Sequence, residues 1–248
     1  MTETALHQEL EIIYQDEHVV AINKPAGLLV HRSKVDPRAA WFAMQMVRNQ
    51  VGRHVFPVHR LDKPTSGVLL FGLSKDAARR LAPQFSDRSI KKSYLAIVRG
   101  YVEKSGTIDY PLREILDRKT DARARPDKAP QPAITVYEML ARVELPHPVG
   151  RYATARYSLV RLYPQSGRKH QLRRHMKHIF HPILGDRKFG DWRHNLFLEQ
   201  QFDCRQLLLH ASTLEFEHPF SNRRITIKAK TSDLFLRVAK EMKFDVEV

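Results

Sequence analysis

The residues best suited to chemistry lie at positions 59–67, which read His-Arg-Leu-Asp-Lys-Pro-Thr-Ser-Gly. Turn-forming residues directly before an apolar run predict a loop that leads into a β-strand. Asp62 would then lie on a short loop held by a rigid sheet, where catalytic groups are commonly placed. Arg60 and Lys63 favour its ionised form, and an ionised carboxylate can be a covalent nucleophile. The residue types leave a structural role open, either as a turn residue or as the partner of Arg60 in an ion pair.

The charge of the chain indicates the kind of partner it has. Among 248 residues, Lys and Arg number 42 and Asp and Glu 27, a formal net charge of +15. Such an excess in a folded domain favours a nucleic acid partner over a merely solubilising surface. A single cysteine excludes an internal disulfide, and the N-terminus lacks the apolar stretch of a signal peptide. No apolar run is long enough to span a bilayer, so we expect a cytoplasmic protein.

Hydrophobic periodicity predicts alternating strands and helices in the first part of the chain. The run at residues 67–73 is almost entirely apolar, which indicates a strand buried on both faces. Ser74 is a good N-cap for a helix that follows it. The predicted strands are residues 11–14, 19–23, 67–73 and 90–98, and the predicted helices are residues 39–51 and 75–85.

The second part of the chain shows the same two patterns. Residues 117–131 are charged and lack apolar positions, so we expect either a basic loop that orders on RNA or a plain solvated insertion. A final helix is predicted to begin at Ser232 or Asp233, with Leu234, Leu236, Val238 and Met242 as its apolar positions. The predicted strands are residues 134–141, 152–163, 214–217 and 224–228.

One predicted helix, residues 169–179, combines an apolar stripe with many cations. Leu172, Met176 and Ile179 follow helical spacing and predict the face that packs on the core. We expect the rest of its surface to face a polyanion. That surface consists of Arg168, Lys169, His170, Arg173, Arg174, His175, Lys177 and His178.

Several common sites are absent from the sequence. It contains no glycine-rich phosphate loop and no dinucleotide fingerprint, so no nucleotide cofactor is expected. The neighbouring histidines are spaced five, three and three residues apart and have no paired cysteines, which does not favour zinc. We therefore predict no metal for His170, His175, His178 and His181.

The motifs together resemble a known family. Residues 59–67 are followed by Lys92-x-Tyr94-x-Ala96 and by residues 166–175, which read Ser-Gly-Arg-Lys-His-Gln-Leu-Arg-Arg-His. His-Pro-Ile-Leu-Gly-Asp at residues 181–186 and Leu-His-Ala at residues 209–211 come next. In this order and spacing they resemble the RluA-type pseudouridine synthases, over roughly residues 10–230. Within that family the chain is most similar to the branch that modifies uridine 65 of tRNA.

The resemblance implies a fold and a reaction. The fold is α+β, a single catalytic domain at residues 11–248 after a tail at residues 1–10. It has a curved, largely antiparallel mixed sheet with flanking helices and a basic central cleft. The reaction converts uridine in RNA to pseudouridine without cofactor or metal. Because Lys24 already belongs to the first family motif, no S4-type RNA-binding module is expected before it.

The resemblance also assigns roles by motif position. Asp62 is the catalytic aspartate, whether it attacks ribose or base or removes a ribose proton. Tyr94 stacks on the uracil, and Arg173 pairs with Asp62. Arg60 enters the helix stack, where it offsets part of the few kcal/mol that flipping a base costs. The remaining residues assigned to RNA binding are His59, Lys92, Arg168, His170 and Leu209.

Two positions depart from the family pattern. Phe180 stands where glycine is common, and Phe189 stands where tyrosine is common. We expect neither to touch the chemistry. The leading interpretation is a monomeric tRNA pseudouridine synthase. The alternatives are an enzyme that modifies ribosomal RNA and a non-catalytic RNA-binding or chaperone protein.

Overall fold

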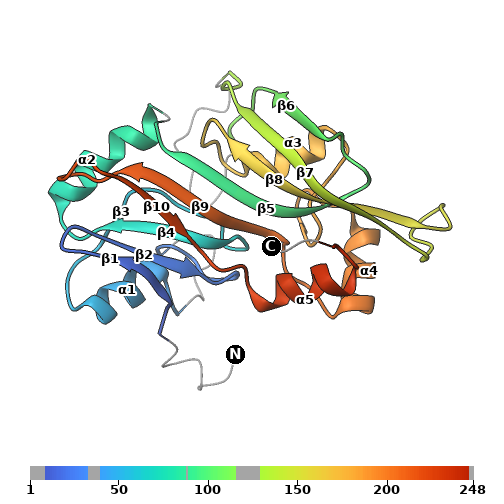
Figure 1. Cartoon of the computed structure of the whole chain (residues 1–248), viewed down its shortest axis with the longest axis horizontal. Coiled ribbons are helices and arrows are strands. Elements are labelled where there is room, and N and C mark those ends of the chain that lie inside the picture. Colours follow the sequence, from blue (N-terminus) through green and yellow to red (C-terminus); the bar gives the residue numbers. More distant parts are fainter. Residues whose placement is uncertain (1–8, 33–39, 88, 116–128, 246–248) are drawn as a thin grey trace.

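The computed structural model describes residues 9–32, 40–87, 89–115 and 129–245, which build a single curved sheet flanked by helices (Figure 1). The strands are β1 (Ile12–Gln15), β2 (Val19–Lys24), β3 (Phe56–Pro57), β4 (Ser66–Gly72), β5 (Lys91–Arg99), β6 (Ser105–Asp109), β7 (Ile134–Leu145), β8 (Ala155–Pro164), β9 (Leu209–Glu217) and β10 (Arg224–Lys228). The helices are α1 (Ala43–Val51), α2 (Lys75–Ser86), α3 (Gln171–His178), α4 (Trp192–Phe202) and α5 (Asp233–Glu241).

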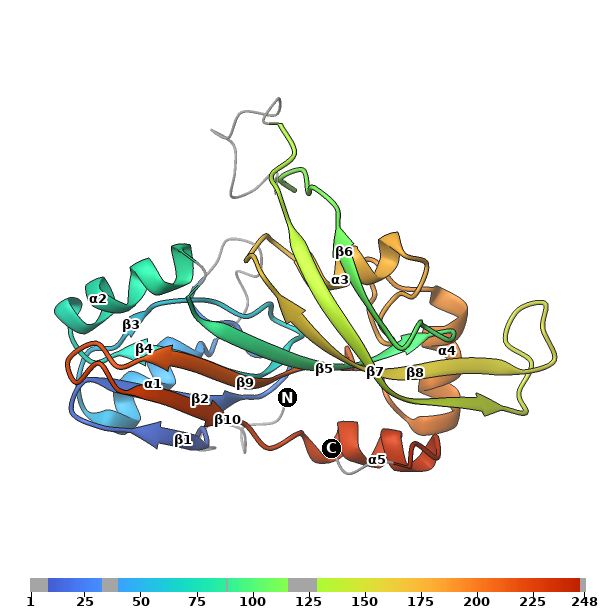
Figure 2. The same ribbon diagram turned by 45° about the horizontal axis from the view of Figure 1, so that its top comes forward.

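The sheet is mixed but mainly antiparallel. Its main path runs β1-β2-β4-β9-β5-β8-β7-β6, with β10 beside β9 and β3 beside β4. Only β4 and β9 pair in parallel among the described strands. Figure 2 shows β6, β7 and β8 turned steeply away from β1, β2 and β4, so that β5 and β9 lie in the bend. The predicted α+β fold with a curved, largely antiparallel mixed sheet is confirmed.

Strand β4 is the most deeply buried strand, because both of its faces are covered. All seven of its residues are buried. Leu69 and Phe71 pack into the cluster that contains Val47 of α1, whereas Leu70 packs on the other face with Leu81 of α2. Alternating side chains of a strand point to opposite faces, so an unbroken apolar run suits this position. The predicted double burial is confirmed.

The junction between β4 and β9 depends on Gly67. Its φ is +108°, and a Cβ there would lie 2.2 Å from the carbonyl oxygen of Ala211. Next to it, the hydroxyl of Ser66 lies 2.9 Å from Nδ1 of the buried His210. The loop that carries Asp62 enters the sheet here, so this close backbone approach sets where that loop ends.

Most predicted elements are present, and some details are wrong. The hydroxyl of Ser74 accepts a hydrogen bond from the Ala77 amide at 3.0 Å, as its N-cap role requires. Helix α1 begins at Ala43 rather than at residue 39. Strand β6 and helix α4 were not predicted. Ser232 caps α5 as expected, but its buried face includes Phe235 and Ala239, which were not in the predicted stripe.

The predicted cationic face of helix α3 requires a correction. Arg173 and His175 were expected on its solvent side, yet Arg173 is 6% exposed and His175 fully buried. His175 hydrogen-bonds the hydroxyl of Thr135 and the carbonyl of Tyr110, both at 3.0 Å. These bonds satisfy its ring in the interior, where a histidine can substitute for an apolar residue. Most of the predicted loop at residues 117–131 lies outside the described residues.

We predict that Gly67→Ala destabilises the protein by about 3 kcal/mol or more, because the new methyl group meets backbone atoms in a left-handed conformation. Chemical denaturation measures the change in unfolding free energy. Gly167→Ala is the matched control, since nothing lies within 4 Å of a Cβ at that exposed position. Equal stability of the two variants would contradict the importance of the β4–β9 junction.

Candidate active site

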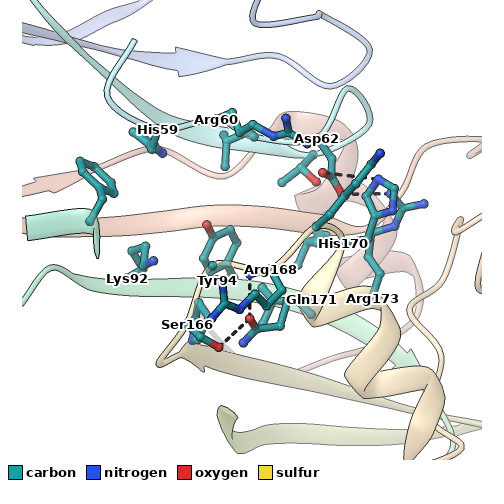
Figure 3. A pocket seen from close by; sticks show the side chains of 18 of the residues that line it. His59, Arg60, Asp62, Lys92, Tyr94, Ser166, Arg168, His170, Gln171 and Arg173 are labelled. Atoms are coloured by element: carbon teal, nitrogen blue, oxygen red, sulfur yellow. Dashed lines mark hydrogen bonds and ion pairs between the residues drawn. The ribbon is translucent and has the colours of Figure 1, made fainter. Parts of the chain in front are cut away.

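A cavity of about 480 Å³ opens where the loop at residues 58–65 faces the start of β5 and the N-terminus of α3 (Figure 3). Every residue to which the resemblance assigned a catalytic or RNA-binding role lines it. These residues are His59, Arg60, Asp62, Lys92, Tyr94, Arg168, His170, Arg173 and Leu209. Segments far apart in the chain therefore converge on one concave site, of a volume that suits a small molecule or a nucleoside.

Two side chains from the start of α3, Arg173 and His170, lie next to the carboxylate of Asp62. One oxygen, Oδ2, accepts a hydrogen bond from Nη1 of Arg173 at 3.0 Å. The other, Oδ1, lies 3.8 Å from Nε2 of His170. The carboxylate is 20% exposed. It therefore keeps an oxygen available to a ligand in the cavity while its charge is balanced by a guanidinium.

Arg173 is anchored by a second acid, Asp186. Its Nε and Nη2 each donate to a different oxygen of Asp186 at 2.7 Å. Bonds from Arg173 hold the pKa of Asp186 below its usual range, although burial acts in the opposite direction. The amides of Lys188 and Phe189 also donate to Asp186. Asp186 belongs to a motif of the sequence, but no local pattern reveals that its partner lies in the preceding helix.

Tyr94 lies on β5, opposite Leu162 of β8 and Ala211 of β9. Burial, and then the charge of Asp62, raise the pKa of its hydroxyl above its usual range. The phenol therefore stays protonated at neutral pH. In Figure 3 its ring lies on the same side of the cavity as Lys92, across from the loop that carries Asp62. This places a flat aromatic surface and a proton donor beside the carboxylate.

His170 adopts a strained backbone at the start of α3. Its φ of 57° is left-handed, which costs a non-glycine residue about 1–2 kcal/mol. Burial lowers its pKa to about 4, although the charge of Asp62 opposes the fall. Its Nδ1 is buried and has no hydrogen-bond partner among the described residues. A neutral imidazole in a costly conformation next to Asp62 is typical of a functional position.

Phe189 corrects one expectation. The sequence placed it away from the chemistry, but Arg173 lies over its ring at 5.1 Å from the centroid. The His170 ring is 5.5 Å away. A guanidinium above an aromatic face is stabilised electrostatically, so Phe189 helps to fix Arg173. Phe180, the other departure, is 79% exposed.

The remaining predicted residues differ in charge and exposure. His59 stacks on Phe85 at 4.8 Å, and its Nε2 accepts a hydrogen bond from the Leu70 amide. Burial and then Lys92 lower the pKa of His59 to about 3, so its ring is neutral. Arg60 is exposed at the rim, whereas burial lowers the pKa of Lys92. The lysines and arginines that line the cavity are Arg60, Lys92, Arg168, Lys169 and Arg173, so the cavity is predominantly basic.

The chain was compared with families of known proteins. Residues 18–178 match the family described as RNA pseudouridylate synthase, a stretch that contains Asp62, Tyr94 and Arg173. The chain belongs to the RNA pseudouridylate synthase family. The predicted family, and an isomerase that acts on RNA, are confirmed.

Individual relatives support the same assignment. The synthase is 58% identical to a Yersinia pestis protein named tRNA pseudouridine synthase C, over 89% of this chain and 86% of that one. A Pectobacterium carotovorum protein of the same name is also 58% identical, and the match spans 59% of its length. The human RNA pseudouridylate synthase domain containing 4 has a TM-score of 0.71 and 26% identity, covering 95% and 94% of the two chains.

Lys24 occupies an unexpected place in the synthase. The sequence placed Lys24 only within a family motif, yet its side chain is fully buried. Its ammonium donates to the carbonyls of Pro25, Leu28 and Lys63 at 2.8, 2.9 and 3.3 Å. Since Lys63 follows Asp62, this buried amine ties the loop of the carboxylate to the segment after β2.

Among the described residues, no helix is long and apolar enough to cross a membrane.

We predict that Asp186→Asn lowers the rate of pseudouridine formation about ten- to hundredfold, because Arg173 loses the anion that orients it. The assay compares kcat for the two proteins on one RNA. Asp191→Asn is the matched control, since Asp191 forms a similar ion pair with Arg99 away from the cavity. A rate equal to that of the control would show that Asp186 does not position Arg173.

We predict that Lys24 makes the stability of the synthase depend on pH. Burial lowers its pKa to about 7, although Asp62 opposes the fall. Between about pH 7 and 10 the unfolded chain then binds more protons than the folded one, so stability rises with pH by up to about 1.4 kcal/mol per unit. Denaturation of the wild type and of Lys24→Met across this range measures the difference. Parallel curves would contradict the prediction.

Proposed function

We propose that this protein converts uridine 65 of tRNA to pseudouridine. The observation that carries the proposal is the meeting of Asp62, Tyr94 and Arg173 in one basic cavity, although Asp62 and Arg173 are 111 residues apart in the chain. The tRNA substrate is supported by the relatives, which are named tRNA pseudouridine synthase C. The net charge of +15 suits a polyanionic substrate.

In this proposal each catalytic group has one task. The reaction breaks the bond between C1′ of the ribose and N1 of uracil, turns the base and joins C5 to C1′. Asp62 supplies the negatively charged oxygen that reacts with the target nucleotide. Arg173 balances and orients that carboxylate. Tyr94 stacks on the uracil. When C5 joins C1′, C5 loses a proton and N1 gains one, and the Tyr94 hydroxyl relays this transfer by releasing its own proton as it accepts that of C5.

The other cavity residues deliver the base to Asp62. A stacked nucleotide must leave the helix, which costs a few kcal/mol. The exposed Arg60 fills the vacated space and contacts phosphate, which offsets part of that cost. Lys92 and Arg168 neutralise nearby phosphates. The neutral rings of His59 and His170, with Leu209, form the less polar wall against which the uridine rests.

The proposal extends to the setting of the reaction. A single catalytic domain at residues 11–248 acts as a monomer, in the cytoplasm, where tRNA is found. It needs no metal and no nucleotide cofactor, since the groups for the isomerisation are Asp62, Tyr94 and Arg173.

We predict that Asp62→Asn abolishes pseudouridine formation, lowering the rate by at least about a thousandfold, because the amide lacks the reactive anion. Binding of tRNA should stay within about threefold, since most of the affinity comes from phosphate contacts. Cells that lack the protein are complemented with either form, and pseudouridine is mapped in tRNA and ribosomal RNA.

The wild type should restore the modification at tRNA position 65, and Asp62→Asn should not. If pseudouridine is restored in ribosomal RNA alone, the substrate is ribosomal RNA and not tRNA. If Asp62→Asn is active, Asp62 is not the catalytic residue. If both forms bind RNA but neither modifies any RNA, the protein is a non-catalytic RNA-binding protein.

A further inference from the structure

A second cavity, of about 740 Å³, adjoins the Asp62 cavity, since Arg173 lines both. Asp186, the partner of Arg173, lines the second. The wall between the two is thus built by one guanidinium and the carboxylate that holds it. The second cavity is bordered by the loop after β2, the residues after Asp62, the loop at residues 185–188 and the start of α5.

Cations outnumber acids around this second cavity, although Arg173 is paired with Asp62 and Asp186 and Arg205 with Glu199. The cations that line it are Lys63, Arg173, Arg187, Lys188 and Arg205. Asp186 is the only carboxylate among its described lining residues, and both of its oxygens are engaged by Arg173. Arg187 and Lys188 are exposed at the rim. The cavity therefore attracts an anion.

The rest of the lining is apolar. Ala26 and Pro64 come from the two loops, Leu207 precedes β9, and Leu234 belongs to the first turn of α5. An apolar surface with cations at its edge matches the two halves of a nucleotide, a base that packs on side chains and a phosphate that needs positive charge. A simple phosphate site would not require the apolar part.

We propose that this second cavity binds a nucleotide of the substrate RNA that flanks the target uridine. Its base packs on Leu207 and Leu234, and its phosphate meets Arg187 and Lys188. The inference rests on the proposed function, since it assumes an RNA strand in the Asp62 cavity. The shared wall supports an RNA occupant over a free nucleotide, because neighbouring nucleotides of one strand can occupy adjacent cavities that a single side chain separates.

Two variants test the two halves of this site. Leu234→Trp fills the cavity and should raise KM for tRNA about tenfold while kcat changes less than twofold. Leu236→Trp, also partly buried on α5 but outside the cavity lining, should leave KM unchanged. Arg187→Gln should reduce the slope of log binding constant against log salt concentration by the amount expected for the loss of about one phosphate contact. Arg223→Gln, another exposed arginine, should not.

An RNA series identifies the bound nucleotide. Each nucleotide flanking the target uridine is replaced in turn by an abasic residue, and binding to the wild type and to Leu234→Trp is measured. At one position the abasic RNA should bind the wild type about tenfold more weakly than the intact RNA does. Leu234→Trp should bind the abasic and the intact RNA with equal affinity at that position.

The inference would be overturned if, at every position, the abasic replacement weakened binding to the wild type and to Leu234→Trp by the same factor. A second result would also overturn it: uridine monophosphate binds the wild type but not Leu234→Trp, and all variants have the same KM for tRNA. The cavity would then hold a free nucleotide. The wild type could modify no RNA and still lose affinity at one abasic position at which Leu234→Trp loses none. In that case the proposed function fails, and the second cavity keeps its assignment as a nucleotide site.

Discussion

The active site depends on one shared cation. Arg173 is almost fully buried, and a buried guanidinium is tolerated only when it is paired. Asp186 takes two of its donors and Asp62 takes one. This division leaves Asp186 as a fixed counter-charge and Asp62 as a carboxylate with an oxygen still open to the cavity. Removal of either acid would leave the balance of charge around Arg173 incomplete.

The fold supplies the three members of this ion network from separate segments. The loop of Asp62 is held by the amine of Lys24 on the Lys63 carbonyl and ends at the Gly67 junction. Arg173 comes from the first turn of α3, and Asp186 from the loop that follows this helix. Because each anchor is a backbone bond or a buried pair, the relative positions of the two acids are set before any ligand arrives.

The sequence predicted what depends on local patterns. A continuous apolar run identified β4, and helical spacing with an N-cap identified α2 and α5. Motif order brought Asp62, Tyr94 and Arg173 into one site. It did not predict β6 or α4, and periodicity alone placed Arg173 and His175 on the solvent side of α3. Their burial depends on partners elsewhere, Asp186 for one and Thr135 for the other. Lys24 was missed for the same reason, since its carbonyl partners come from tertiary structure.

The pKa values of the two cavity histidines explain how RNA and chemistry can share one cleft. Burial keeps His59 and His170 neutral at physiological pH, so neither competes with Arg173 for the charge of Asp62. The positive charge that phosphates meet comes instead from Arg60, Lys92 and Arg168. The two arginines keep their protons across this range. These two histidines therefore add no change of charge to the cavity near neutral pH, and Arg173 remains the guanidinium that pairs with Asp62.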